Sequence, residues 1–235
     1  MKLSASREAL LGALQAVIGV VERRQTMPIL ANVMLVAKDN QLSITATDIE
    51  VELVSTVDVD VDMAGDLTVP GRKMFEFCQK LPEGATIKLA LRGEKVVLQS
   101  GPSRATLLPL PAAEFPIIDE IDAEQAITLP SSVLHRLLAK TYFAMAQQDV
   151  RYYLNGLLLE TDAKMVRAVA TDGHRLALCE SELGDDTSME ARQVIVPRKG
   201  VLELQRLVAG DGPVSISMGR NHIRVEIGSI RFTSK

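Results

Sequence analysis

Histidine, cysteine and paired carboxylates most often carry catalysis or bind metals, and the 235-residue chain uses them sparsely. Its three histidines and two cysteines lie far apart, with no spacing typical of a metal site. Asp172 and His174 lie two positions apart, which does not orient a carboxylate behind a catalytic base. The glycine motifs of nucleotide-binding loops and serine hydrolases are absent. The sequence therefore favours a non-catalytic protein without metal or cofactor.

Two short segments concentrate side chains that bind ligands. Residues 147–156 read QQDVRYYLNG, and tyrosine, arginine and amide groups on a loop can hydrogen-bond phosphates. Residues 171–176 read TDGHRL, a turn in which glycine permits a positive φ, and with Leu154 it could rim an apolar groove. The alternatives are a strand entry with aromatic packing and an ordinary hairpin turn, and the residues alone favour neither interpretation.

The charge is unevenly distributed along the chain. The expected helical windows 7–24, 72–80, 131–140 and 198–206 carry a net charge of +7, whereas the whole chain carries −4. If the helices share one face, that face is basic and attracts a phosphate backbone without reading base sequence. The alternative is that every helix simply has a solvated charged face. Few aromatic residues and no tryptophan disfavour a stacking platform for single-stranded nucleic acid.

Composition also bounds where the protein acts. A hydrophobic fraction of 47% with 24% charged residues predicts a packed core rather than disorder. No apolar run is long enough to span a membrane, and the first residues lack the apolar core of a signal peptide. Cys78 and Cys179 are expected to be free thiols in a reducing compartment, so we expect a cytoplasmic protein.

An internal repeat sets the architecture. Ala46-Thr47-Asp48 recurs as Ala170-Thr171-Asp172 after 124 residues, and Val69-Pro70 recurs as Val196-Pro197 after 127 residues. The sequence therefore predicts two copies of one α+β domain, residues 1–120 and 128–235, joined by a linker at 121–127. Each copy is expected to hold two helices, the first capped by Ser6 or Ser131, and several strands, including one half-buried strand over 51–61.

The segments that carry the repeat and the dense motifs also carry a family resemblance. RQTMPIL at 24–30, MAQQDVRYYLNG at 145–156, ATDGHRL at 170–176 and VIVPRKG at 194–200 are similar to the bacterial DNA polymerase III beta subunit, the sliding clamp. The likeness covers essentially the whole chain. It implies a DNA-clamp fold, in which tandem domains place two helices each on antiparallel sheets, and a processivity factor of DNA replication rather than an enzyme.

The resemblance also assigns roles to residues. Family members close into a homodimeric ring around duplex DNA, with helices lining the hole. By matching position, the resemblance implies DNA contacts at Arg24, Gln148, Tyr152 and Tyr153, with weaker candidates at Arg72, Lys73, Arg198 and Lys199. It implies half of a peptide-binding groove at Leu154, Thr171, Gly173, His174, Arg175 and Leu176. The implied partners are double-stranded DNA, the replicative polymerase catalytic subunit, the clamp loader, and translesion and repair polymerases.

The chain departs from the family in two ways. It holds two domain copies where the family has three, so it is expected to be a monomeric two-domain fragment, or an adaptor that keeps part of the groove without encircling DNA. A two-domain chain that closes as a trimer is a further alternative, and a nuclease or hydrolase that uses Asp172 and His174 is another. The expected edge strand also has Ala105 where the family usually has an aromatic, followed by Pro109, and both changes are expected to weaken a ring joint there.

Overall fold

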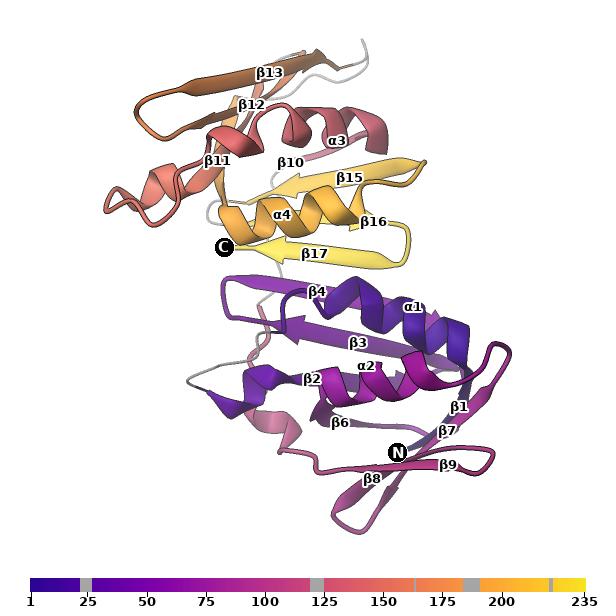
Figure 1. The fold of residues 1–235 in the computed structure, drawn as a ribbon. Coiled ribbons are helices and arrows are strands. Elements are labelled where there is room, and N and C mark those ends of the chain that lie inside the picture. Colours follow the sequence, from indigo (N-terminus) through magenta and orange to yellow (C-terminus); the bar gives the residue numbers. More distant parts are fainter. Residues whose placement is uncertain (22–26, 119–124, 163, 184–190, 220–221) are drawn as a thin grey trace. The chain divides into compact units, whose positions relative to one another are not determined.

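The computed structural model describes residues 1–21, 27–118, 125–162, 164–183, 191–219 and 222–235 (Figure 1). The chain divides into two compact units, Met1–Ile118 and Asp119–Lys235. The predicted linker at 121–127 lies partly outside the described residues, and its last three residues already belong to strand β10, which begins at Gln125.

The first unit packs two helices against antiparallel strands. Strands β5, β1, β7, β8 and β9 pair in that order, as do β4, β3, β2 and β6. The helices α1 and α2 contact each other, and α1 also packs on β4 and β3. The elements are β1 Lys2–Ser6, α1 Arg7–Val17, η1 Pro28–Ala31, β2 Asn32–Lys38, β3 Gln41–Thr47, β4 Val51–Asp58, β5 Asp60–Met63, β6 Gly65–Pro70, α2 Gly71–Lys80, β7 Thr86–Arg92, β8 Lys95–Ser100, β9 Ser103–Leu107 and η2 Ala112–Glu114.

The second unit has the same plan. Strands β10, β15, β16 and β17 pair in that order, as do β13, β12, β11 and β14. The helices α3 and α4 contact each other and pack on these strands. The elements are β10 Gln125–Pro130, α3 Ser131–Ala139, η3 Tyr142–Ala144, η4 Tyr152–Asn155, β11 Gly156–Asp162, β12 Met165–Thr171, β13 Leu176–Glu182, β14 Arg192–Pro197, α4 Arg198–Leu207, β15 Pro213–Met218, β16 Ile223–Ile227 and β17 Ile230–Ser234.

The structure confirms the repeat in register. At the offset of 124 residues, η1, β2 and β3 fall on η4, β11 and β12 with identical bounds. At the offset of 127 residues, β6, α2 and β9 fall on β14, α4 and β17 in the same way. The two offsets differ by three residues, and the extra residues lie between β13 and β14. The two units are therefore structural copies, each with its own core.

The helix starts differ from the predictions in one case. The side chain of Ser6 accepts a hydrogen bond from the backbone N–H of Ala9 at 3.2 Å, so the predicted N-cap of α1 is confirmed. The cap predicted at Ser131 is wrong, because Pro130 holds that position and Ser131 is the first helical residue. The buried Ser131 hydroxyl instead donates to the carbonyl of Val208 at 2.9 Å, tying α3 to the end of α4.

The single half-buried strand predicted over 51–61 is also wrong. The chain leaves β4 at Asp58 and continues in β5, which pairs with β1 instead of β3. The first five residues of β4 are all buried, so this strand has no wet face at its start. Another segment of the chain covers the outer face of β4. Alternation along a strand predicts one buried face, and it cannot show that a distant segment buries the other.

The covering segment follows β9. Phe115 is buried against Met34, Ile29 and Leu30, and the hydroxyl of Thr68 accepts from the N–H of Leu110 and donates to its carbonyl. The carboxylate of buried Glu52 accepts a hydrogen bond from the N–H of Ile118 at 3.0 Å. Residues 110–118 thus cover part of the outer face of β4, β2 and β6, while Val36 on β2 stays 39% exposed.

The matching face of the second unit carries an apolar row that is partly exposed. Leu178, Val169, Leu158 and Ile195 lie side by side in one row across β13, β12, β11 and β14. Leu178 and Ile195 are about half exposed, at 52% and 46%. In the first unit the corresponding row contains Met34 and Thr68, both buried under the covering segment.

Candidate functional site

The loop between η3 and β11 carries the densest motif of the sequence and is closed on itself. The N–H of Asp149 donates to Oδ1 of Asn155 at 2.9 Å, and Nδ2 of Asn155 donates back to the carbonyl of Asp149 at 2.8 Å. The N–H of Ala146 donates to the carbonyl of Leu154 at 3.0 Å. These bonds fix both ends of the loop, so the side chains between them project from a defined backbone.

Within this loop Asp149 and Arg151 form an ion pair. The carboxylate of Asp149 accepts from Nε of Arg151 at 3.0 Å and from Nη2 at 2.9 Å, as well as from the Arg151 N–H at 2.8 Å. The side-chain hydrogen bonds from Arg151, followed by its backbone N–H, lower the pKa of Asp149 from 3.8 to about 2. Asp149 is therefore ionised at neutral pH, and the ion pair is intact.

The predicted DNA-contact residues of this loop are free to reach outward. Tyr152 is 84% exposed, and its ring meets Tyr153 edge-on with centroids 5.9 Å apart. Gln148 is exposed and has φ 59°, a left-handed conformation that is uncommon for a residue other than glycine. The structure brings Gln148, Tyr152 and Tyr153 together on one short loop.

The predicted basic contacts divide into two kinds. Arg72 donates from Nη2 to the carbonyl of Val21 at 2.6 Å, and Arg198 donates from Nη1 to the carbonyl of Met145 at 3.3 Å. Val21 and Met145 correspond at the offset of 124 residues, so both arginines brace the same place in their units. Each is partly buried and has a structural role as well as a charge.

The two predicted lysines follow these arginines. Lys73 is exposed on α2, whereas Lys199 is partly buried on α4. Arg24 lies outside the described residues, and in the sequence it falls on Gln148 at the offset of 124.

The turn that holds the predicted peptide-binding residues also occurs in the first unit. The hydroxyl of Thr171 accepts from the N–H of Gly173 and donates to the carbonyl of Arg175, and Asp172 accepts from the N–H groups of His174 and Arg175. Thr47 and Asp48 make the same four bonds after β3. Thr171 and Gly173 therefore build the turn, and they place the side chains that follow.

The turns differ at the position of Gly173, which in the first unit is occupied by Ile49. Gly173 has φ +86°, and its counterpart Ile49 has φ 82° with a branched side chain in a left-handed conformation. A Cβ at position 173 would also lie 3.1 Å from Nη2 of Arg151. Glycine at this position thus lets the turn lie directly against the Asp149–Arg151 ion pair. The motifs at 147–156 and 171–176 meet there.

The outward side chains of the turn surround Phe143. Arg175 bonds Asp172 through Nε at 3.0 Å, donates to the carbonyl of Phe143 at 2.8 Å, and lies 5.7 Å above the Phe143 ring. His174 is exposed, Leu176 is 64% exposed, and Phe143 is 50% exposed. Leu154 is only 8% exposed, so it contributes mainly packing below this surface.

Sequence reasoning missed two members of this surface. Phe143 supports Arg175, and the guanidinium of Arg151 joins the two motifs, yet neither was among the candidate residues. Arg151 stands inside the dense motif, so its charge was a usable signal. Phe143 has no such signal, because only the folded turn brings Arg175 over its ring.

The described residues hold neither a candidate metal cluster nor a candidate membrane span. Among them, no three His, Cys, Asp or Glu side chains cluster in a way that could hold a metal ion. No helix within the described ranges is long and apolar enough to cross a membrane.

Comparison with known proteins places this surface in context. Residues 1–119 match the model of the DNA polymerase III beta subunit N-terminal domain, and residues 128–235 match the model of its central domain. The beta sliding clamp of Pseudomonas putida is 50% identical over 237 aligned residues, and that of Escherichia coli K12 is 48% identical. Both alignments cover all of this chain and 64% of the relative, so the chain spans somewhat less than two thirds of these curated proteins.

Solved structures give the same result. A crystal structure of a sliding clamp from Pseudomonas aeruginosa bound to griselimycin superposes with a TM-score of 0.95 at 50% identity, covering all of this chain and 64% of that one. The Caulobacter crescentus pol III beta structure superposes with a TM-score of 0.95 at 40% identity, covering 65% of that chain.

Proposed function

Because this chain belongs to the DNA polymerase III beta subunit family, as its match to two of the family's domain models shows, we propose that it forms the first two domains of a sliding clamp. The predicted α+β clamp fold is confirmed by the superposition on solved clamps. In the proposed role these two domains form part of a ring that encircles duplex DNA and tethers the replicative polymerase, and they catalyse no reaction themselves. The observation that carries the proposal is 50% identity to a beta sliding clamp across the entire chain.

The solvent-exposed polar and basic side chains support DNA binding through phosphate contacts that do not read the base sequence. Lys73 on α2 is exposed, Gln148, Tyr152 and Tyr153 project from a closed loop, and these groups suit phosphate contacts. Such contacts give affinity that falls with salt and does not depend on base sequence, as a sliding protein requires.

A peptide groove fits the surface around Phe143 and Leu176. Two half-exposed apolar side chains lie beside the cationic Arg175 and the exposed His174, which could bind the polar groups of a short peptide. Burying one leucine or phenylalanine anchor contributes roughly 1.5–3 kcal/mol. The family resemblance, rather than this geometry, names the partners: we propose that the clamp loader, the replicative polymerase, and the translesion and repair polymerases compete for this surface.

The alternative is a fragment or adaptor that keeps part of the groove and does not encircle DNA. The observation behind it is the span of 64% of the relatives' length. In that case binding to a peptide survives, whereas retention on circular DNA does not.

The test compares binding to duplexes of two unrelated sequences by fluorescence anisotropy. Replacing Arg24 and Gln148 together by alanine is expected to weaken both complexes equally and to flatten their salt dependence. Loss for only one base sequence would contradict the proposed contact mode. A variant with Lys38→Ala, at the exposed last residue of β2, serves as the matched control and is expected to retain more affinity than the double variant.

A further inference from the structure

Arg175 and Phe143 form a pair that is fixed at several points. Nε of Arg175 donates to Oδ2 of Asp172 at 3.0 Å, and its Nη2 donates to the carbonyl of Phe143 at 2.8 Å. The guanidinium carbon lies 5.7 Å from the centroid of the Phe143 ring, within the range of a cation–π interaction. Among the described residues, none accepts a hydrogen bond from Nη1 of Arg175, whose side chain is 59% exposed. These contacts hold the guanidinium and leave one of its nitrogens available to a ligand.

The segment that carries Phe143 is itself anchored to the core of the second unit. The hydroxyl of buried Thr141 donates to a carbonyl of α3 at 2.7 Å. Met145 is buried, and its carbonyl accepts a hydrogen bond from Arg198 of α4 at 3.3 Å. Phe143, which lies between these two anchors, is nevertheless 50% exposed. Its ring therefore stands at the surface on a fixed backbone.

The repeat shows that the turn folds without this pair. At the offset of 124 residues, Phe143 falls on Gly19, and Arg175 falls on Val51, which is fully buried. The turn after β3 still makes the same four hydrogen bonds as the turn after β12. Folding of the turn therefore does not account for the arginine and the aromatic ring of the second unit.

The two units also differ in what lies beside the turn. In the first unit the carboxylate of Glu52 accepts a hydrogen bond from the N–H of Ile118, so the unit's own chain lies there. At the same offset Glu52 falls on Leu176, which is 64% exposed. The Arg175–Phe143 pair thus accompanies an exposed apolar side chain at the place that the first unit fills with its own segment.

We propose that Phe143 is a positioning residue for peptide binding, and that the Arg175–Phe143 pair restricts this binding to the second unit. The inference rests on the proposed peptide groove and deepens it. A long arginine side chain loses rotamer freedom when it binds a ligand, and Phe143 and Asp172 fix Arg175 before the ligand arrives. The expected ligand is a short peptide whose apolar end packs beside Leu176 and whose backbone carbonyl accepts from Nη1 of Arg175.

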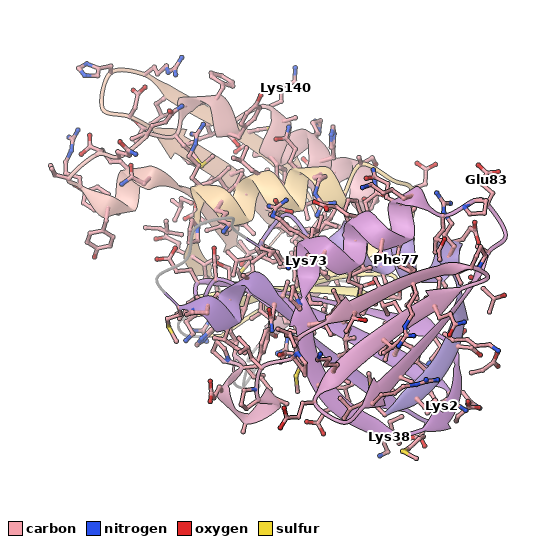
Figure 2. The ribbon with its side chains drawn as sticks, turned by 60° about the horizontal axis from the view of Figure 1, so that its bottom comes forward. Lys2, Lys38, Lys73, Phe77, Glu83 and Lys140 are labelled. Carbon is pink, nitrogen blue, oxygen red and sulfur yellow. The ribbon has the colours of Figure 1, made fainter. Side chains whose placement is uncertain are left out.

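The binding test uses the whole 235-residue chain and a fluorescein-labelled peptide of serine and glutamine that ends in leucine and phenylalanine. Phe143→Leu keeps the backbone carbonyl and removes the ring, and we expect it to weaken binding about threefold. Phe143→Tyr restores a ring and should restore the affinity. In an Arg175→Met background, Phe143→Leu should have no further effect. The matched control is Lys140→Ala, which removes a cation from the exposed residue that follows α3 (Figure 2) and should stay within about twofold of the parent.

NMR of the chain without peptide tests the positioning directly. The Nε–H signal of Arg175, assigned by its absence in Arg175→Met, should shift when Phe143→Leu removes the ring, and Phe143→Tyr should leave it close to its place in the parent. Thermal unfolding of each variant checks that the second unit is intact. A general loss of structure would move many signals, whereas loss of the ring should move those around Arg175.

Different results would overturn the inference and the proposed groove. Equal binding by the parent and Phe143→Leu would overturn the positioning role, and so would an Arg175 signal that does not move. A full effect of Phe143→Leu in the Arg175→Met background would also overturn it, because the ring would then act without the arginine. A parent chain that does not bind the peptide would contradict the proposed groove and the role built on it.

Discussion

At the scale of single residues, the pKa of Asp149 shows whether its ion pair with Arg151 forms in solution. Arg151 lowers the Asp149 pKa to about 2, whereas a free aspartate has a pKa of about 4. The ion pair therefore contributes its full stability above about pH 4. That contribution is lost as the pH falls toward 2, because protonation removes the acceptor. We expect carboxyl NMR to give a midpoint near 2 in the parent and a higher midpoint in Arg151→Ala, still below 3.8 because the N–H of residue 151 remains a donor. A midpoint that does not move would show that the pair is not formed.

Gly173 is the second position where one residue decides the local structure. Gly173→Ala forces a side chain into a left-handed conformation and against Arg151, so we expect a loss of about 1–2 kcal/mol in the unfolding free energy of the second unit. Gly84→Ala is the matched control, since Gly84 has φ +72° but open space around it. Chemical denaturation should show a greater loss for Gly173→Ala. Equal losses would mean that the Arg151 contact adds nothing.

At the scale of elements, the covering segment 110–118 is the part of the first unit that sequence patterns missed. Phe115→Ala empties a buried site on β2, and we expect destabilisation of about 3–5 kcal/mol. Hydrogen exchange of the β2 and β3 amides measures it, and the expected result is loss of protection there. Phe143→Ala, at a half-exposed phenylalanine, should leave those amides unchanged. Unchanged exchange in Phe115→Ala would show that the cover is not part of the core.

The elements also show why prediction succeeded in some places and failed in others. The helices α2 and α4 were predictable because apolar spacing and the Val-Pro pairs before them are local signals. The single strand predicted over 51–61 failed because its cover comes from more than fifty residues away and its end changes partner strands. In the site, the turn was predictable from Thr171, Asp172 and Gly173. The interaction of Arg175 with Phe143 was not, because it joins positions 32 residues apart.

At the scale of the whole molecule, the open question is whether two domains suffice to hold DNA. The light-scattering mass of the purified chain decides between the fragment and a self-closing ring. We expect 25.6 kDa, one chain, and no retention on nicked circular DNA after gel filtration in high salt. A mass about three times larger, with retention that is lost when the circle is cut, would instead support a ring of three two-domain chains.

The edge strand bears on the same question. Ala105 pairs with Leu98 of β8, while Pro109 lies beyond the last residue of β9, Leu107. The missing N–H of Pro109 therefore costs the strand no hydrogen bond, and Ala105→Phe is the sharper change. If ring closure depends on an aromatic here, Ala105→Phe should raise the mass measured at high protein concentration. An unchanged mass would assign the joint to other residues.

The different offsets of the repeat have a practical consequence for anyone who wishes to label this protein. Six elements of the first unit, η1, β2, β3, β6, α2 and β9, have the same lengths as their counterparts, and the three-residue difference between the two offsets lies between β13 and β14. A position where evolution has already lengthened one copy is a place where added chain leaves the fold unharmed. The stretch between Leu183 and Arg192 is therefore the natural insertion point for an epitope or a fluorophore-binding tag.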